Sequence, residues 1–295
     1  MQSIVPATFI RLGGSQQQIS DTLGPLADLA GKWVGSQGWN IIAVPSSGSQ
    51  PQDTGDFQLL VRPYTETITF VPVGAPVRNR GGALDQFVGA LEYELRINDL
   101  ETAEVLHVEN GMWLYLGNIQ PDSGTSTLPS PAFTIARSAT VPQGDSTLVL
   151  GNSVVEPGAP NIPDISTLPP DTGQGTPFGY LDPYLVPRTG INVSNPNATL
   201  RQESEGQTIL STTTMQLDSQ NQGGINNIPF IAQYAQPTRF QCIFWLETVQ
   251  IPNSNQTFQQ LQYSQIIDLE FHKKFGDVPG LITWPHANIN TLRKQ

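Results

Sequence analysis

The sequence predicts an all-β protein that closes into an antiparallel up-and-down barrel of about ten strands. Segments in which apolar and polar residues alternate recur along most of the 295 residues. Short stretches rich in glycine, asparagine and proline separate them at the spacing of hairpins. Helical periodicity is scarce. The length of the last strands favours a barrel over the alternative, a jelly-roll sandwich.

The first expected element is a short helix over 21–30, which starts with an acidic residue and is followed by Gly31. Gly24 and Pro25 limit this helix to one or two turns. The strands are expected, in order, at 32–44 with a glycine bend at 35–38, and then at 56–63, 64–71, 87–98, 105–116, 132–141, 146–155, 207–217, 239–252, 257–271 and 287–292.

Residues 156–200 interrupt this series with nine prolines. The segment is too rich in proline for a sheet and too long for an ordinary loop. We therefore expect a single domain over 1–295, with an N-terminal arm and short helix at 1–28 and a Pro-rich insertion or lid at 156–200. If the segment is a lid, its removal should leave folding intact and change ligand access.

Charge and cysteine content exclude several classes of protein. The chain has 14 Lys and Arg against 25 Asp and Glu, a net charge of −11, and no basic stripe. Electrostatic binding to nucleic acid or to an anionic membrane is therefore not expected. The single cysteine, Cys242, excludes an intrachain disulfide framework. We expect no signal peptide and no membrane-spanning helix, and a cytoplasmic location fits this best.

The segment Leu29–Gly35 (LAGKWVG) places a short helix directly before Gly-x-Trp and the first strand. This arrangement resembles the opening of the calycins, the lipocalin and fatty-acid-binding group. The resemblance implies that Trp33 plugs one end of the barrel. It also implies that a basic residue of the last strand, Arg293 or Lys294, lies over the indole in a cation–π contact.

A second resemblance rests on three segments: LAGKWVGSQG at 29–38, LHVENGMW at 106–113 and WPH at 284–286. Together they resemble the nitrobindin-like haem-binding barrels, in a longer, uncharacterised branch. The likeness covers 20–150 and 205–295. The opening has one residue more between its glycines than the family pattern, and 156–200 has no counterpart in short members. The resemblance implies that His286 ligates the iron of haem b from inside the barrel.

The histidines are the candidate functional residues. His286 follows Trp284-Pro285, which we expect to form a rigid turn at the barrel rim. His107 and Glu109 lie two residues apart on one strand and so share a face, either as an acid–base pair or as part of a polar outer surface. With His286 they could also form a two-His-one-carboxylate metal site.

Arg78 and Arg80 lie in an expected polar loop at 78–82. Their guanidinium groups suit carboxylates, such as haem propionates or a fatty-acid head group, although the loop could equally be a solvated turn. The sequence thus favours a haem-binding barrel that could act on NO, peroxide or small oxidisable substrates. The alternatives are a haem-free carrier of an apolar molecule such as a fatty acid, and a structural or interaction module with a filled interior.

Overall fold

The computed structural model describes residues 16–46, 56–79, 84–121 and 131–295. Ten long strands close an antiparallel barrel within these residues, each paired with the next one along the chain, and the first paired with the last. This confirms the predicted all-β up-and-down barrel. The barrel strands are β1 (Gly31–Pro45), β2 (Phe57–Pro72), β4 (Leu84–Asp99), β5 (Val105–Tyr115), β7 (Ile135–Val141), β8 (Asp145–Pro157), β9 (Thr208–Asn227), β10 (Gln236–Gln250), β11 (Thr257–Lys273) and β12 (Leu281–Lys294).

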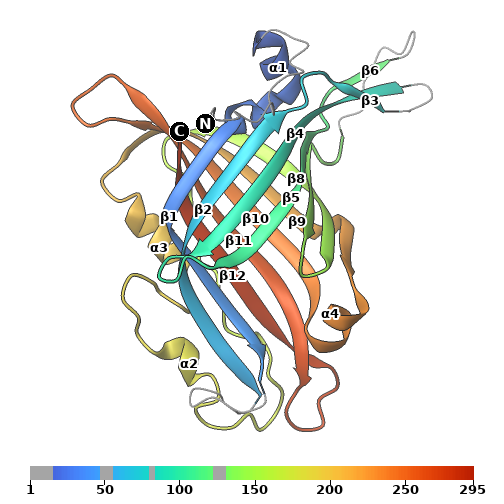
Figure 1. Cartoon of the computed structure of the whole chain (residues 1–295), viewed down its shortest axis with the longest axis vertical. Coiled ribbons are helices and arrows are strands. Elements are labelled where there is room, and N and C mark those ends of the chain that lie inside the picture. The colour runs from blue at the N-terminus through green and yellow to red at the C-terminus, as the bar shows by residue number, and fades with distance from the viewer. Residues whose placement is uncertain (1–15, 47–55, 80–83, 122–130) are drawn as a thin grey trace, which may run out of the picture.

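Two short strands pair with the first residues of β4, outside the ten-strand barrel. The helices are all short. The strands are β3 (Val77–Asn79) and β6 (Ile119–Pro121). The helices are α1 (Gln16–Leu23), the 3-10 helix η1 (Gly24–Leu29), α2 (Asp182–Leu185), α3 (Asn197–Glu203) and α4 (Pro229–Tyr234). Figure 1 shows α1 at one end of the barrel and α4 towards the other. Across the described ranges, every helix is too short or too polar to cross a membrane.

The expected strand boundary between 63 and 64 is wrong. The sequence predicted separate strands at 56–63 and 64–71, but β2 runs through both. Pro63 lies within β2 next to the point where pairing with β4 begins, at Tyr64. On that side Pro63 therefore lies at a free edge, where its missing N–H breaks no ladder hydrogen bond.

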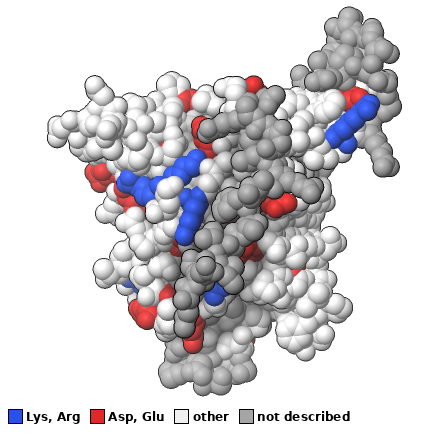
Figure 2. All heavy atoms as spheres, turned by 45° about the horizontal axis from the view of Figure 1, so that its top comes forward, with Lys and Arg blue, Asp and Glu red and all other residues white. Residues whose placement is uncertain are grey.

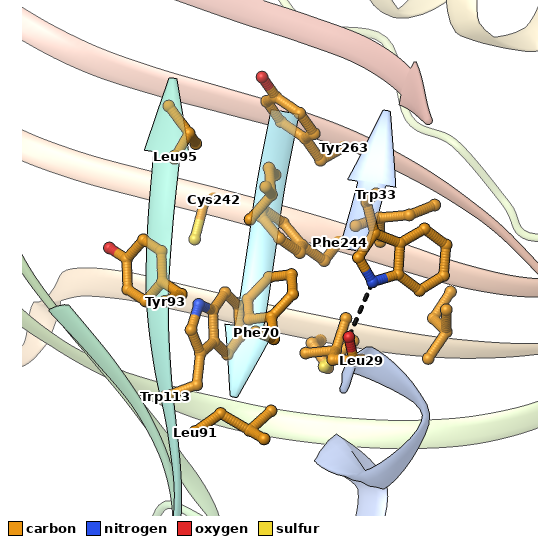
Figure 3. Packing of buried hydrophobic residues seen from close by; sticks show 14 of the residues in the cluster. Leu29, Trp33, Phe70, Leu91, Tyr93, Leu95, Trp113, Cys242, Phe244 and Tyr263 are labelled. Carbon is orange, nitrogen blue, oxygen red and sulfur yellow. Dashed lines mark hydrogen bonds between the residues drawn. The ribbon is translucent and has the colours of Figure 1, made fainter. Parts of the chain in front are cut away.

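Trp33 closes one end of the barrel. Its side chain is fully buried, and its indole N–H donates to the carbonyl oxygen of Leu29 at 2.7 Å (Figure 3). The Lys294 ammonium lies 5.3 Å from the centroid of the Trp33 ring, as the resemblance to calycins implied. Arg293 instead lies over the ring of Phe258, at 3.6 Å.

The barrel wall is packed on both faces. The interior core gathers side chains from most strands around Trp33 and Trp113 (Figure 3). On the outside, Ala287 and Ile289 of β12 pack with Tyr184 and Leu200 in a second core. We call residues 158–207 the strap, because they lie along one side of the barrel (Figure 1).

The strap packs against the outside of the barrel wall. Its residues Ile162, Tyr184 and Leu200 are buried in the outer core. The strap therefore supports the wall, and its role as a lid stays a prediction. Figure 2 shows a face on which uncharged residues dominate and basic side chains form small clusters, in keeping with a charged content of 13%.

Candidate functional site

A cavity of about 290 Å³ lies at the end of the barrel opposite Trp33. It is bounded by the far half of β1, by ends of β4, β5, β7, β8, β10, β11 and β12, and by α4. Its apolar side chains include Ile42, Val44, Ile97, Leu106, Ile231, Ile267 and Leu269, and its polar ones are Asn40, His107, Gln143, Asp145, His286 and Asn288. An apolar cavity with a few converging polar groups has the character of a small-molecule site. We call it the main cavity.

His286 points into the main cavity from β12. Its Nε2 lies 2.6 Å from Oδ1 of Asn40 and 3.2 Å from Nδ2 of Asn288. The contact with Asn40 needs the ring proton on Nε2, because an amide oxygen can only accept, whereas the contact with Asn288 Nδ2 needs Nε2 to accept; the shorter contact favours the proton on Nε2. Within the described part of the chain, Nδ1 makes no hydrogen bond. Burial, with a smaller effect from His107, lowers the pKa of His286 to about 3, so the imidazole is neutral, the form that ligates metals.

The expected turn at 284–286 is wrong, because these residues lie inside β12. β12 pairs with β11 throughout this stretch, but its pairing with β1 reaches only Ala287. Pro285 therefore lies beside a free edge of the ladder, where a proline is tolerated. The strand, and not a turn, fixes the direction of the His286 ring.

His107 and Glu109 share the inner face of β5, so the reading of a polar outer face is wrong. His107 Nε2 lies 3.4 Å from Glu109 Oε2. Glu109 is also bound by Arg137, whose guanidinium donates to Oε1 at 2.6 Å. Burial alone would raise the pKa of Glu109, but Arg137 and His107 lower it to about 2. Glu109 thus acts as a fixed anion that orients His107, not as a group that gains and loses a proton near neutral pH.

Arg137 is a site residue that sequence reasoning missed. It is 1% exposed and also donates to the hydroxyl of Tyr93 at 3.1 Å and to Gln265 Oε1 at 3.0 Å. Its signal in the sequence is a single charge in the middle of β7 (IARSATV). An isolated charge on a strand reads equally well as a solvent-facing residue, so the signal was weak.

A second buried acid, Glu66, ends a chain of hydroxyl groups. Tyr263 lies 2.8 Å from Glu66 Oε2, Tyr64 lies 2.7 Å from Tyr263, and Tyr64 lies 3.0 Å from the carbonyl oxygen of Ile289. Tyr263 and the Asn290 amide both donate to Glu66 Oε2, at 2.8 Å and 2.7 Å, and these hydrogen bonds favour the carboxylate. Burial outweighs them and raises the pKa of Glu66 to about 7.

Gly38 gives Tyr64 the room for this contact. A Cβ atom at Gly38 would lie 2.1 Å from the Tyr64 ring, so only glycine fits there. The register of β1 against β2 shifts between Gly35 and Gly38, which confirms the predicted glycine bend.

The structure does not bring Arg78 to the site. Arg78 pairs with Phe87 of β4, whereas the cavity residue Ile97 lies ten residues further along the same strand, roughly 33 Å away. Arg78 instead binds Asp85 at 2.5 Å. Arg80 lies outside the described residues.

The two-His-one-carboxylate set is also not formed. His107 and His286 line the same cavity, but Glu109 lies behind His107 and is bound to Arg137. Across the described ranges, no group of three or more His, Cys, Asp or Glu side chains is arranged to hold a metal ion.

The residues of the main cavity fit haem in their donor chemistry. His286 presents a neutral imidazole whose Nε2 is held by an amide oxygen, as metal-ligating histidines usually are. The volume of about 290 Å³ is at the lower end of the range of about 300–1,000 Å³ for ligand pockets, so a haem would project beyond the cavity. No Lys or Arg is among the described lining residues to pair with the propionates.

No family model matches this chain, and no curated protein matches its sequence. Among solved structures, it is similar to the crystal structure of Rv2717c from M. tuberculosis, with 13% sequence identity and a TM-score of 0.42 over 94% of this chain and 97% of that one. At that TM-score the likeness carries no argument, and the fold rests on the strand pairing described above.

Proposed function

We propose that this barrel binds haem in the main cavity, with His286 as the ligand of the iron. The observation that supports the proposal is the neutral His286 imidazole on an apolar wall, with one nitrogen held by Asn40 and the other without a partner in the described part of the chain. Haem bound there would supply an iron centre for NO or peroxide.

The chain's own residues have separate roles in this proposal. Asn40 fixes the orientation of His286 through the 2.6 Å contact. Ile42, Ile267 and Leu269 exclude water from one side of the ligand. His107, held by Glu109, is the polar group of the same cavity that could donate to or accept from a small molecule bound beside the haem.

A haemin titration followed in the visible spectrum tests the proposal. We expect a saturable Soret band for the wild type and for His272→Ala, whose histidine lies outside the lining of the main cavity. We expect the band to be lost or strongly shifted in His286→Ala. Equal spectra for wild type and His286→Ala would overturn the role of His286.

The volume of the main cavity favours a second candidate, a carrier of a smaller apolar molecule without haem. At about 290 Å³ the cavity would enclose such a molecule more fully than it would enclose haem. Native mass spectrometry of protein purified without added ligand distinguishes the two. A retained organic mass without iron supports the carrier, and a retained mass equal to haem supports the first proposal.

A further inference from the structure

A smaller chamber of about 50 Å³ continues from the main cavity into the barrel. The two spaces share four lining residues, Val141, Asp145, Pro237 and Ile267. We call this space the inner chamber. It exceeds the roughly 10–15 Å³ that a single water needs, so it has room for one small polar group.

The inner chamber presents oxygen atoms that lack a hydrogen-bond partner. Asp145 Oδ1 and Thr147 Oγ1 both line the chamber, are buried, and have no partner within the described residues. The two residues are separated by one position on β8 and so share its inner face. Buried oxygens of this kind are costly unless a donor meets them.

The charges around the chamber favour a cationic donor. Glu109 also lines the chamber, but the Arg137 guanidinium already balances it at 2.6 Å. Asp145 makes no ion pair with a lysine or arginine within the described ranges. Burial raises the pKa of Asp145, and His107 offsets this in part. The uncompensated carboxylate is therefore Asp145, at the junction of the two spaces.

We propose that the inner chamber binds the ammonium group of a small amine whose apolar remainder extends into the main cavity. Asp145 supplies the countercharge, and Thr147 accepts a further hydrogen bond. The proposal shares with the haem proposal only the premise that the main cavity is a ligand site, and it uses different residues. It also excludes a fatty-acid head group, because a carboxylate would face Asp145.

Calorimetric titration with hexylamine, hexan-1-ol and hexanoate tests this inference, because the three probes share a six-carbon chain and differ in the head group. We expect hexylamine to bind about tenfold more tightly than hexan-1-ol, and hexanoate to bind more weakly than both. In Asp145→Asn we expect hexylamine and hexan-1-ol to bind within about twofold of each other. Asp182→Asn, which changes an exposed acid outside both spaces, should keep the wild-type preference.

Thr147→Val retains the carboxylate and should weaken hexylamine binding by a smaller factor, so it serves if Asp145→Asn does not fold. Three results would overturn the proposal. Hexanoate binds as tightly as hexylamine, or Asp145→Asn keeps the wild-type preference for hexylamine over hexan-1-ol, or no probe binds. A haemin titration of Asp145→Asn separates the two proposals. If Asp145→Asn retains the Soret band and loses the preference for the amine, the substitution affects the inner chamber alone. If it loses the Soret band and keeps the preference for the amine, it affects haem binding alone.

Discussion

Replacing Glu66 with glutamine should flatten the dependence of stability on pH. Burial raises the pKa of Glu66 from 4.5 to about 7, so the folded protein keeps a proton that the unfolded chain releases above about pH 4.5. Because the unfolded state then binds fewer protons, the free energy of unfolding falls as the pH rises from about 4.5 through about 7, and then levels off. Glutamine cannot ionise, so the variant lacks this loss.

The size of the effect follows from the same pKa. A rise from 4.5 to about 7 corresponds to about 3 kcal/mol, at about 1.4 kcal/mol for each tenfold change in proton affinity. The wild type should therefore lose about 3 kcal/mol more than Glu66→Gln between pH 4.5 and pH 8. Glu203 and Glu247, whose pKa values burial also raises to about 7, contribute a slope that both proteins share.

Urea denaturation at intervals between pH 4.5 and pH 8 measures the difference, with the m-value checked at each pH. Glu94→Gln is the matched control, because Glu94 is exposed on β4, and its slope should equal that of the wild type. If the free energy of unfolding changes between pH 4.5 and pH 8 by amounts that agree within about 1 kcal/mol in the wild type and in Glu66→Gln, the raised pKa of Glu66 is refuted.

Three further predictions concern packing and buried charge, and each is measured by urea denaturation. Arg137→Leu should lower the free energy of unfolding by about 3–5 kcal/mol, because it leaves the Glu109 carboxylate buried without the Arg137 guanidinium. The double variant with Glu109→Leu should recover much of this loss. Equal losses in the single and the double variant would contradict the pairing of the two residues. Trp33→Ala should cost about 3–5 kcal/mol, and a loss below about 1 kcal/mol would show that Trp33 does not close the barrel. Leu200→Ala should cost about 2–5 kcal/mol if the strap supplies core, whereas unchanged stability would make the strap dispensable.

The sequence predicted the barrel because strands that cover an apolar interior show alternation over their whole length. It also predicted the end plug, through the resemblance of Leu29–Gly35 to the opening of the calycins, and left open whether Arg293 or Lys294 lies over Trp33. Strand boundaries at prolines were less predictable. Pro63 and Pro285 read as breaks, but each lies beside an unpaired edge, and only the full pairing scheme shows where such edges are.

The second half of β9 was missed for a related reason. The expected strand at 207–217 ends before Gly223 and Gly224, yet both lie within β9 at positive φ of 94° and 150°, next to a shift in the register against β8. A glycine bulge and a turn have the same composition, and they differ in what pairs across from them.

The polar interior was the hardest part to predict. Alternation places His107 and Glu109 on one face of β5 but does not say which face points inwards. Glu66, Arg137 and Tyr263 come from three other strands, and only the closed barrel brings them close. His286 was found by resemblance, whereas its partner Asn40 has no signal in the sequence beyond a place in the first strand.

A substitution that fills the main cavity tests most directly whether it is the binding site. Ala235 lines the cavity at the end of α4, whereas Ala232 on the same helix is exposed and does not line it. Haemin and hexylamine titrations of Ala235→Trp should show loss of binding, and Ala232→Trp should bind both as the wild type does. If Ala235→Trp retains wild-type affinity for these ligands, or if the wild type binds neither, the cavity is not the functional site.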